Sequence, residues 1–288
     1  MLPWFDSLSQ GQKLLLCGLA LWLTILALYF SRILRARWSE KPDFLAFDPA
    51  LTPLPEVAAA RLDPQRSRLE QAGFELVGAY LYHPLPPSKL VAMVLLLVHP
   101  QRKEWAHLSA QVIGTAGLDR LVTSDLQIRS YPADGQPESI LTWNTSQVVL
   151  STDPLTNIVL QVPHVTDADR LLELHHIAVR KYCGSGKMAW LPGSPARSEQ
   201  AFAGVRLTPQ EIVELAQRQW DRTWQGLVRR GLMWQMPDGD YCCGLRIAIK
   251  LFQSAVFPLS RIRRVLLWSK SRRLERELIL WAKHHPDV

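Results

Sequence analysis

One short segment of the chain contains the glycines and the lysine that phosphate-binding loops use. It includes Gly186 and Lys187, but a P-loop also needs a glycine five residues before Gly186 and a Ser or Thr after the lysine to hold magnesium. Lys181 and Met188 occupy those two positions. A nucleophile elbow at Ser185 is excluded too, because neither outer position of its G-x-S-x-G pattern is glycine. We therefore predict a helix end followed by a loop, and no nucleotide cofactor.

A second segment, Glu173-Leu-His-His176, places a carboxylate and an imidazole one helical turn apart. A di-iron bundle needs such pairs on two helices together with two further carboxylates. Zinc needs at least a third ligand, and the sequence contains no CxxC or HExxH. We therefore predict an ordinary amphipathic helix and no metal.

No Ser/His/Asp or Cys/His set has a local signature in this sequence. An active site would have to be assembled from residues far apart in the chain. In this enzyme alternative, His107, Asp119 and His175 are the side chains expected to meet in a cleft between a sheet and its helices.

The first element that could position such residues is an N-terminal apolar segment. Seventeen residues, Leu14–Phe30, carry no charge, and as a helix they extend about 25 Å, near the lower limit for crossing a bilayer. A cleaved signal peptide would have its basic residues before the apolar run, and a buried core helix would not end in a basic cluster. We predict a retained single-pass anchor, with lipid-facing residues Leu14, Leu19, Trp22, Ile25 and Phe30.

The charges around the anchor predict its orientation. Arg32, Arg35 and Arg37 follow the apolar run, whereas Lys13 alone precedes it. The positive-inside rule then places the N-terminus outside and the whole body in the cytoplasm. The four cysteines form no disulfide pattern, which fits a reducing compartment.

The middle of the chain predicts an α+β fold with an antiparallel meander. A helix is expected to begin at Asp63-Pro64 and end at Gly73, and another to run from a cap at Thr166, Asp167 or Asp169 to Gly184. Short connections between the strands favour antiparallel pairing. The predicted strands are Phe74–Tyr82, Lys89–Val98, Trp105–Ile113, Leu121–Tyr131, Glu138–Asn144 and Asn157–Val162.

Composition shifts divide the chain into five parts. We expect a tail and anchor over 1–38, a Pro-rich tether over 39–62 and the sheet domain over 63–184. A linker over 185–207 and a helical module with a small hairpin over 208–288 follow. In the module, Thr208-Pro-Gln-Glu211 is a capping box. A helix and a hairpin over 208–243, followed by a second helix that starts near Gly244, also outline a winged helix. Arg229 and Arg230 are placed for phosphates, so nucleic-acid binding through 208–243 is a further alternative.

The end of the chain is basic and amphipathic. The formal net charge of +7 is concentrated in 1–41 and 244–288, and the residues between them carry a slight acidic excess. Basic segments with tryptophan bind membrane surfaces, although the same pattern fits helices packed on their own domain with a solvated basic face. The predicted membrane-surface residues are Arg246, Lys250, Arg261, Arg263, Arg264, Trp268 and Lys270.

Composition and motifs together indicate the kind of function. Hydrophobic residues at 48% and charged residues at 20% exclude a disordered chain. We expect a membrane-anchored cytoplasmic interaction or scaffold protein without a cofactor. Its protein partner would bind an exposed sheet face that includes Arg129, Thr142 and Asn144.

Overall fold

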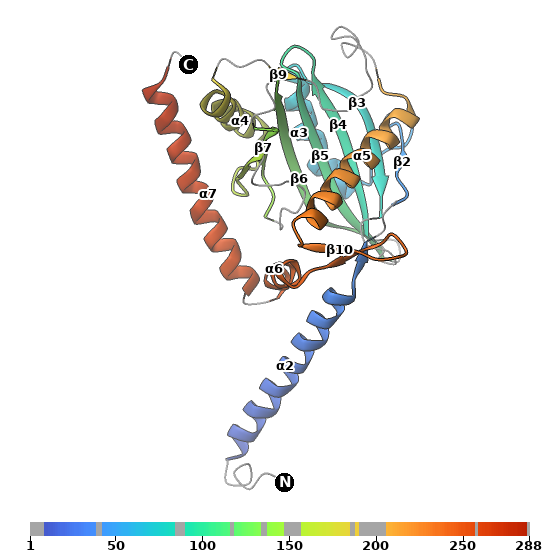
Figure 1. Ribbon diagram of the computed structural model, residues 1–288, viewed down its shortest axis with the longest axis vertical. Helices are drawn as coiled ribbons and strands as arrows, with labels where there is room; N and C mark the ends of the chain where they lie inside the picture. Colours follow the sequence, from blue (N-terminus) through green and yellow to red (C-terminus); the bar gives the residue numbers. More distant parts are fainter. Residues whose placement is uncertain are drawn as a thin grey trace.

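The protein is a mixed α+β structure with six helices and two sheets within the described residues. A computed structural model describes residues 9–38, 42–83, 90–115, 118–133, 137–146, 157–184, 188–189, 206–256 and 259–286. The body stands on one long N-terminal helix, α2, which projects away from it (Figure 1). The predicted α+β class is confirmed.

The larger sheet has the order β2-β3-β4-β5-β6-β7-β8. Neighbours from β2 to β7 are antiparallel, so the meander is confirmed there, but β8 is parallel to β7. The chain between Trp143 and Asn157 is long enough for the crossover that parallel strands need. The strands are β2 (Leu45–Ala46), β3 (Glu75–Tyr82), β4 (Leu90–His99), β5 (Glu104–Thr115), β6 (Leu118–Pro132), β7 (Ser139–Trp143) and β8 (Asn157–Gln161), and β9 (Met188–Ala189) pairs with β6.

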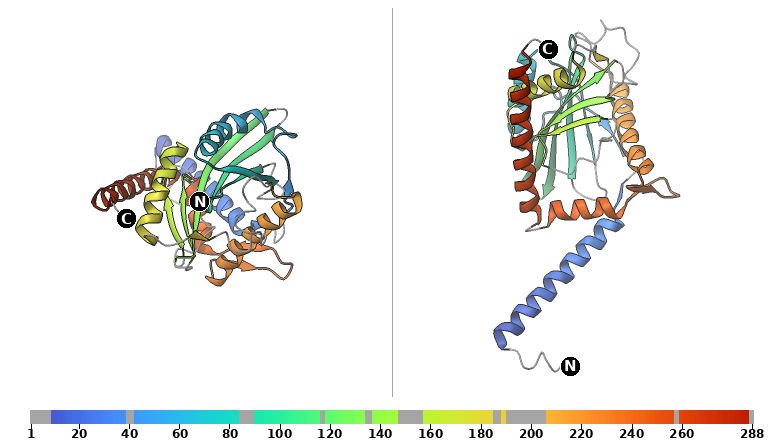
Figure 2. Two further views of the ribbon diagram at one scale, coloured as in Figure 1. Left: turned by 90° about the horizontal axis from the view of Figure 1, so that it is seen from above. Right: turned by 60° about the vertical axis from the view of Figure 1, so that its left-hand side comes forward.

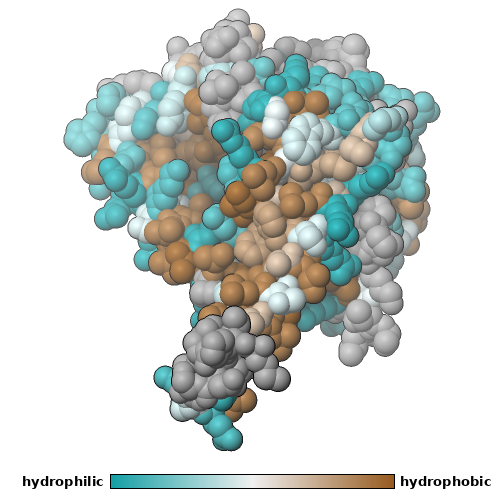
Figure 3. All heavy atoms as spheres, turned by 60° about the horizontal axis from the view of Figure 1, so that its bottom comes forward, coloured by the Kyte–Doolittle hydropathy of each residue, from teal (hydrophilic) through white to brown (hydrophobic). Residues whose placement is uncertain are grey.

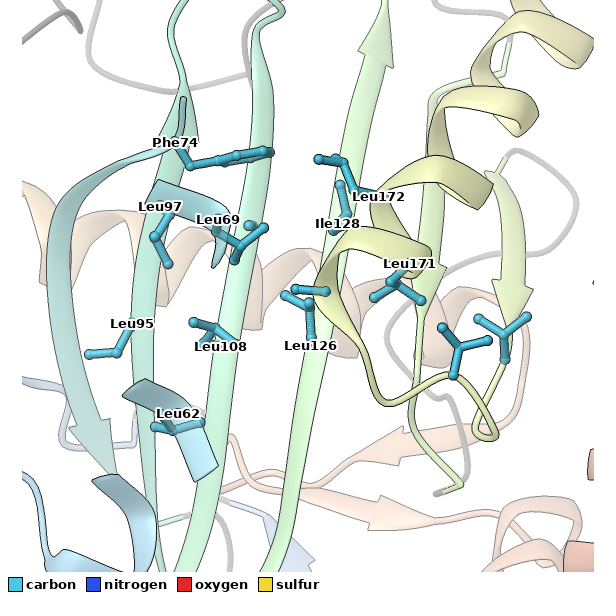
Figure 4. Packing of buried hydrophobic residues seen from close by; sticks show 14 of the residues in the cluster. Leu62, Leu69, Phe74, Leu95, Leu97, Leu108, Leu126, Ile128, Leu171 and Leu172 are labelled. Carbon is cyan, nitrogen blue, oxygen red and sulfur yellow. The ribbon is translucent and has the colours of Figure 1, made fainter. Parts of the chain in front are cut away.

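One face of this sheet forms the main core. Helices α3 (Glu56–Gln71), α4 (Ala168–Cys183) and α7 (Leu259–His284) cover it. Side chains from both layers meet in the cluster that Figure 4 shows, which includes Leu69, Leu108 and Leu171. Strand β4 is buried from Ala92 to His99, as its unbroken apolar sequence predicts for a central strand.

The opposite face is covered by α5 (Pro209–Arg229), which crosses β2 and β3 (Figure 1). Ile212 and Leu215 of α5 pack with Val77 and Leu96 of the sheet. The approach is close, because a Cβ added to Gly78 would lie 2.5 Å from the Ile212 Cδ1. Glycine at this position therefore lets the helix reach the sheet.

The predicted caps are largely confirmed. Thr208 and Glu211 form the capping box of α5, and Asp167 caps α4. The first predicted helix start is wrong, because α3 begins at Glu56 and Pro64 lies inside it. Proline there removes one backbone donor, but its exposed position leaves the freed carbonyl open to water.

The smaller sheet joins the segment after the N-terminal helix to the hairpin that follows α5. The predicted hairpin is present as β10 (Met233–Gln235) and β11 (Tyr241–Cys243). Its third strand is β1 (Arg37–Trp38), which directly follows α2 (Gln10–Arg35). The segment predicted as a tether forms regular secondary structure within its described residues, 42–62. It contains β2, which pairs with β3, and the start of α3.

Leucines on α7 test how firmly this helix is docked. Leu278 is fully buried in the main core, whereas Leu280 is 54% exposed. We expect Leu278→Ala to lower the free energy of unfolding by about 2–5 kcal/mol, because it leaves a cavity. Leu280→Ala is the matched control and should change it by less than about 0.5 kcal/mol. Thermal unfolding in detergent measures both, and equal effects would contradict the docking of α7.

Candidate functional site

The anchor predicted from sequence is a continuous helix. α2 has 26 residues, none of them buried in the body, and is long and apolar enough to cross a membrane. Of the predicted lipid-facing residues, Leu14, Leu19, Trp22 and Ile25 are exposed, and Phe30 is partly covered where α2 meets the body. The interpretation of this segment as a buried core helix is therefore wrong, because α2 does not enter either large core.

A compact aromatic cluster, called the collar here, holds the end of α2. Trp38 lies with its ring centroid 5.7 Å from that of Trp224, and Trp224 stacks on Tyr241 at 5.5 Å. Phe30 and Ile33 of α2 pack against this cluster. The buried members of the collar are Trp38, Trp224, Leu227, Met233, Tyr241, Cys243, Ile247 and Ala248.

Helix α6 (Leu245–Ala255) lies across the end of α2, as Figure 2 shows. Phe252 contacts Phe30 edge to face at 5.3 Å, and Ile247 is buried in the collar. Leu245 and Ile249, on the side of α6 opposite Ile247, are 58% and 41% exposed. One apolar side of this helix thus packs on the collar, and another faces outward beside α2.

The turn into α6 depends on one glycine. A Cβ added to Gly244 would lie 2.4 Å from the Leu232 carbonyl oxygen, which accepts a hydrogen bond from the Gly244 N–H at 2.8 Å. A larger residue would displace this backbone, so the glycine sets the position of α6 on the collar.

Helix α7 is divided between two environments. Its second half is docked on the body, where Ser271 and Leu278 are buried. Its first turns expose apolar side chains instead, with Val265 at 67% and Leu266 at 64%. The second half therefore fits the interpretation of a helix packed on its own domain, and contact of the first turns with a membrane stays a prediction. The exposed apolar residues of α6 and of α7 up to Leu266, called the basal face here, are Leu245, Ile249, Leu259, Ile262, Val265 and Leu266.

Figure 3 brings this side of the molecule forward and shows hydrophobic residues gathered around the place where α2 joins the body. Most of the predicted basic residues lie beside the basal face with exposed side chains, namely Arg246, Lys250, Arg261, Arg264 and Lys270. Arg263 is half-buried and donates to the Ser146 carbonyl at 2.8 Å. Trp268 is partly exposed, with the Arg272 guanidinium 6.0 Å from its ring centroid.

A Ser–His–Glu arrangement fastens α7 to the body. The Ser271 Oγ is 2.7 Å from His164 Nδ1, and His164 Nε2 is 2.6 Å from a Glu275 carboxylate oxygen. These are the residue types of a hydrolase triad, but Ser271 is buried inside a helix and donates to the Trp268 carbonyl. A substrate has no path to that hydroxyl, so the arrangement is structural.

An arginine completes this Ser–His–Glu arrangement, which is called the clamp here. Arg170 donates to the second Glu275 oxygen from Nε at 3.0 Å and from Nη2 at 2.6 Å. Burial alone would raise the pKa of Glu275, but the hydrogen bonds from His164 and Arg170 outweigh it and lower that pKa. The carboxylate therefore stays ionised and holds the second half of α7 in place.

The residues named for an enzyme do not come together. His175 lies between α4 and the sheet, and its ring nitrogens contact the Ser130 hydroxyl at 2.8 Å and the Thr142 hydroxyl at 3.0 Å. His107 lines a cavity on the opposite face, under α5. The Asp119 side chain lies outside the described residues. The expected cluster is thus wrong for the two histidines, because His107 of β5 points to the α5 face and His175 of α4 packs against the opposite face of the sheet.

The predicted partner face is also wrong as a single surface. Thr142 is fully buried against His175, whereas Arg129 lies on the α5 side of the sheet. The Oδ1 of Asn144 is held within the fold, because it accepts from the Leu126 N–H at 2.7 Å.

The remaining motifs have structural partners. Glu173 pairs with Arg170, and His176 Nε2 lies 3.1 Å from the Glu104 carboxylate. Within the described residues no three His, Cys, Asp or Glu side chains are grouped as metal ligands. Gly184 ends α4 as predicted, and 185–187 lie outside the described residues.

The cavity under α5 contains an unusual acid. It has a volume of about 270 Å³, and Asp125, His107 and Gln127 line it together with aromatic rings of α5 and β3. Burial raises the pKa of Asp125 to about 6, although Thr145 and Thr123 donate to it, and burial with the nearby Arg129 charge lowers the pKa of His107 to about 3. This site was not predicted, although the alternation of polar residues on β5 and β6 is a signal that could have found it.

Comparison with known proteins adds no relative, since no family model, curated protein or solved structure matches the chain. The functional conclusion therefore rests on the geometry described above.

The buried Asp125 predicts a pH-dependent stability. Its folded-state pKa is raised from 3.8 to about 6, so its contribution to stability is present at low pH and is lost as the pH rises through about 6. We expect Asp125→Asn to raise the free energy of unfolding by about 1–3 kcal/mol at pH 8 and to have little effect near pH 4.

Thermal unfolding at the two pH values measures this difference. Asp43→Asn changes an exposed aspartate and is the matched control. A stabilisation by Asp125→Asn that is the same at pH 4 and pH 8 would contradict the buried, proton-binding carboxyl.

Proposed function

We propose that this chain is a single-pass membrane protein whose body rests on the cytoplasmic surface of the bilayer and serves there as an interaction or scaffold subunit. The observation that carries the proposal is the basal face. Its exposed apolar residues lie on α6 and the first turns of α7, beside the end of α2. If only a flexible tether held the body, this side would face water, where exposed leucine and isoleucine side chains are unfavourable.

The distribution of charge supports the same arrangement. Exposed Arg246, Lys250 and Arg264 lie beside apolar side chains of the same helices. A basic residue near an anionic membrane surface contributes about 1 kcal/mol to binding. Because α2 already holds the body at the membrane, this second contact needs little affinity of its own.

The orientation follows from the basic residues after the apolar helix. Arg32 and Arg35 lie in the last turn of α2, and Arg37 follows in β1, where it pairs with Asp238 at 2.6 Å. The positive-inside rule favours the cytoplasm for this end of α2. The body, which follows it, is proposed to lie on that side.

The segment 208–243, for which nucleic-acid binding was the alternative prediction, is packed into the body. Its helix α5 covers the large sheet, and its hairpin pairs with β1. Both elements thus have roles within the fold, and the scaffold function is the one that the basal face favours.

Photo-cross-linking tests the contact of the basal face with lipid. A photoreactive amino acid replaces either Leu266 or Leu280 in the full chain, since both are exposed leucines of α7. They lie about 21 Å apart along the helix. We expect lipid adducts from position 266 and essentially none from position 280, because only the first turns reach the bilayer. Equal yields from both positions would contradict the proposal.

Protease protection tests the orientation. In sealed vesicles with the cytoplasmic face outward, added protease should digest the body, and in vesicles of the opposite orientation the body should survive. Detergent-opened vesicles serve as the control for intrinsic protease sensitivity. Protection of the body in the first preparation would show that the proposed orientation is reversed.

A further inference from the structure

The cavity under α5 is not used by the proposed function. It has a volume of about 270 Å³, slightly below the range of drug-sized sites, so its size suits a small molecule. Helix α5 packs mainly on β2 and β3, which leaves space between the helix and the next strands of the sheet. His107 and Ser109 of β5 and Gln127 of β6 line this space and are only half-buried, so solvent reaches the lining.

The register of the sheet gives the cavity a polar part. Neighbouring strands place four residues in one row across β3 to β6, namely Tyr80, Val94, Ser109 and Asp125. Side chains opposite each other in such a row share one face of the sheet, and all four line the cavity. Ser109 therefore lies directly beside Asp125, with their Cβ atoms about 5 Å apart.

A second part of the lining is aromatic. Tyr82 of β3 and Trp220 of α5 have ring centroids 5.8 Å apart, and Trp220 lies 5.0 Å from Trp224. Phe44 joins this cluster at 5.3 Å from Tyr82. All four rings line the cavity. A ligand there thus meets aromatic side chains as well as the polar row.

The charge of the lining is negative. Among the described residues Asp125 is its one carboxylate, and no lysine or arginine belongs to it. His107 is neutral, because burial and the Arg129 charge lower its pKa to about 3. Thr123 and Thr145 donate to Asp125, but no described residue forms an ion pair with it. Because the pKa of Asp125 is about 6, the cavity at pH 8 holds an ionised acid that lacks a cation.

Two arginines in the neighbourhood do not supply this cation. Asp125 also borders a second cavity, between α7 and the sheet, which Arg61 and Arg264 line. Both arginines are exposed, and neither forms an ion pair with a residue that the structure describes. A guanidinium close to the Asp125 carboxyl would lower its pKa, but that pKa is raised. The arginines therefore leave Asp125 unpaired.

Charge and size define the occupant. An anion would lie beside an ionised carboxylate without a basic side chain in the described lining. A metal ion needs several ligands, and no three His, Cys, Asp or Glu side chains of the described residues are grouped. A small organic cation pairs with the acid and also packs on the aromatic rings. It removes the cost of leaving the buried Asp125 carboxylate without a counter-charge.

We propose that this cavity binds a small primary amine whose body is apolar. The ammonium group donates to the Asp125 carboxylate and to the Ser109 hydroxyl, and the body packs on the rings of Tyr82 and Trp220. An ammonium group has three donors and no acceptor, so it matches a carboxylate with a hydroxyl beside it. This ligand site goes beyond the proposed function and does not depend on contact of the basal face with the bilayer.

Isothermal titration calorimetry of the full chain in detergent at pH 8 tests the site, with phenethylamine and 2-phenylethanol as probes. The two molecules have the same apolar body, and only the amine is charged at this pH. We expect the amine to bind at least about tenfold more tightly than the alcohol. Equal affinity for the two probes, or no binding of the amine, would overturn the proposal. Ethylamine should bind more weakly than phenethylamine, and equal binding of these two amines would overturn the role of the aromatic rings.

A variant that keeps the shape of the acid tests its charge. Asp125→Asn should weaken phenethylamine binding about tenfold or more and leave 2-phenylethanol almost unchanged. Misfolding would not explain such a loss, because this variant is expected to be at least as stable as the parent chain at pH 8, which its Tm checks. Glu214→Gln is the matched control, since it removes an exposed carboxylate of α5 outside the lining. Equal amine affinity of Asp125→Asn and the parent chain would overturn the site.

A second variant tests the hydroxyl beside the acid. Ser109→Ala should weaken phenethylamine severalfold but leave its trimethylammonium analogue almost unchanged, because that cation has no N–H to donate. An equal loss for both cations would overturn the role of Ser109. Tighter binding of the analogue than of phenethylamine would overturn the assignment to a primary amine. Lipid cross-linking from position 266 reports on the proposed function alone, so the failure of either proposal leaves the other standing.

Discussion

The arrangement of the whole molecule depends on a short strand pairing at the end of the apolar helix. α2 ends at Arg35, and after Ala36 the chain enters β1, where Trp38 lies opposite Tyr241 of β11. With one residue between helix and strand, the end of α2 cannot swing independently of the collar. Stacking of Trp224 on Tyr241 buries this junction in aromatic contacts. The body therefore takes its orientation from the helix that carries it.

This constraint explains why segments distant in sequence share one side of the molecule. The collar combines residues next to the N-terminal helix with residues of α5, the hairpin and α6. Once α6 is packed on Phe30 through Phe252, α7 has to begin at the same level. The clamp of His164, Arg170 and Glu275 then directs the rest of α7 along the body. The basal face follows from these contacts rather than from any one helix.

Sequence patterns predicted the elements well where one physical rule dominates. The capping box at Thr208, the cap at Asp167 and the buried strand β4 were recognisable because each depends on neighbouring residues. The start of α3 was wrong because tertiary packing of Ala58 and Leu62 extends the helix past Pro64. The candidate site was harder to predict, because the sequence does not show that His107 and His175 lie on opposite faces of the large sheet.

The sequence by itself determined an α+β body behind one apolar helix, with basic residues at both ends. Hydrophobic periodicity and charge are local properties, so they are visible without coordinates. Only the tertiary structure decided which half of α7 is buried, because Leu278 and Leu266 are equally apolar and differ in what lies opposite them. It also decided that Arg61 and Arg264, two hundred residues apart, line one cavity. Contacts of that range depend on how the layers pack, which no local pattern records.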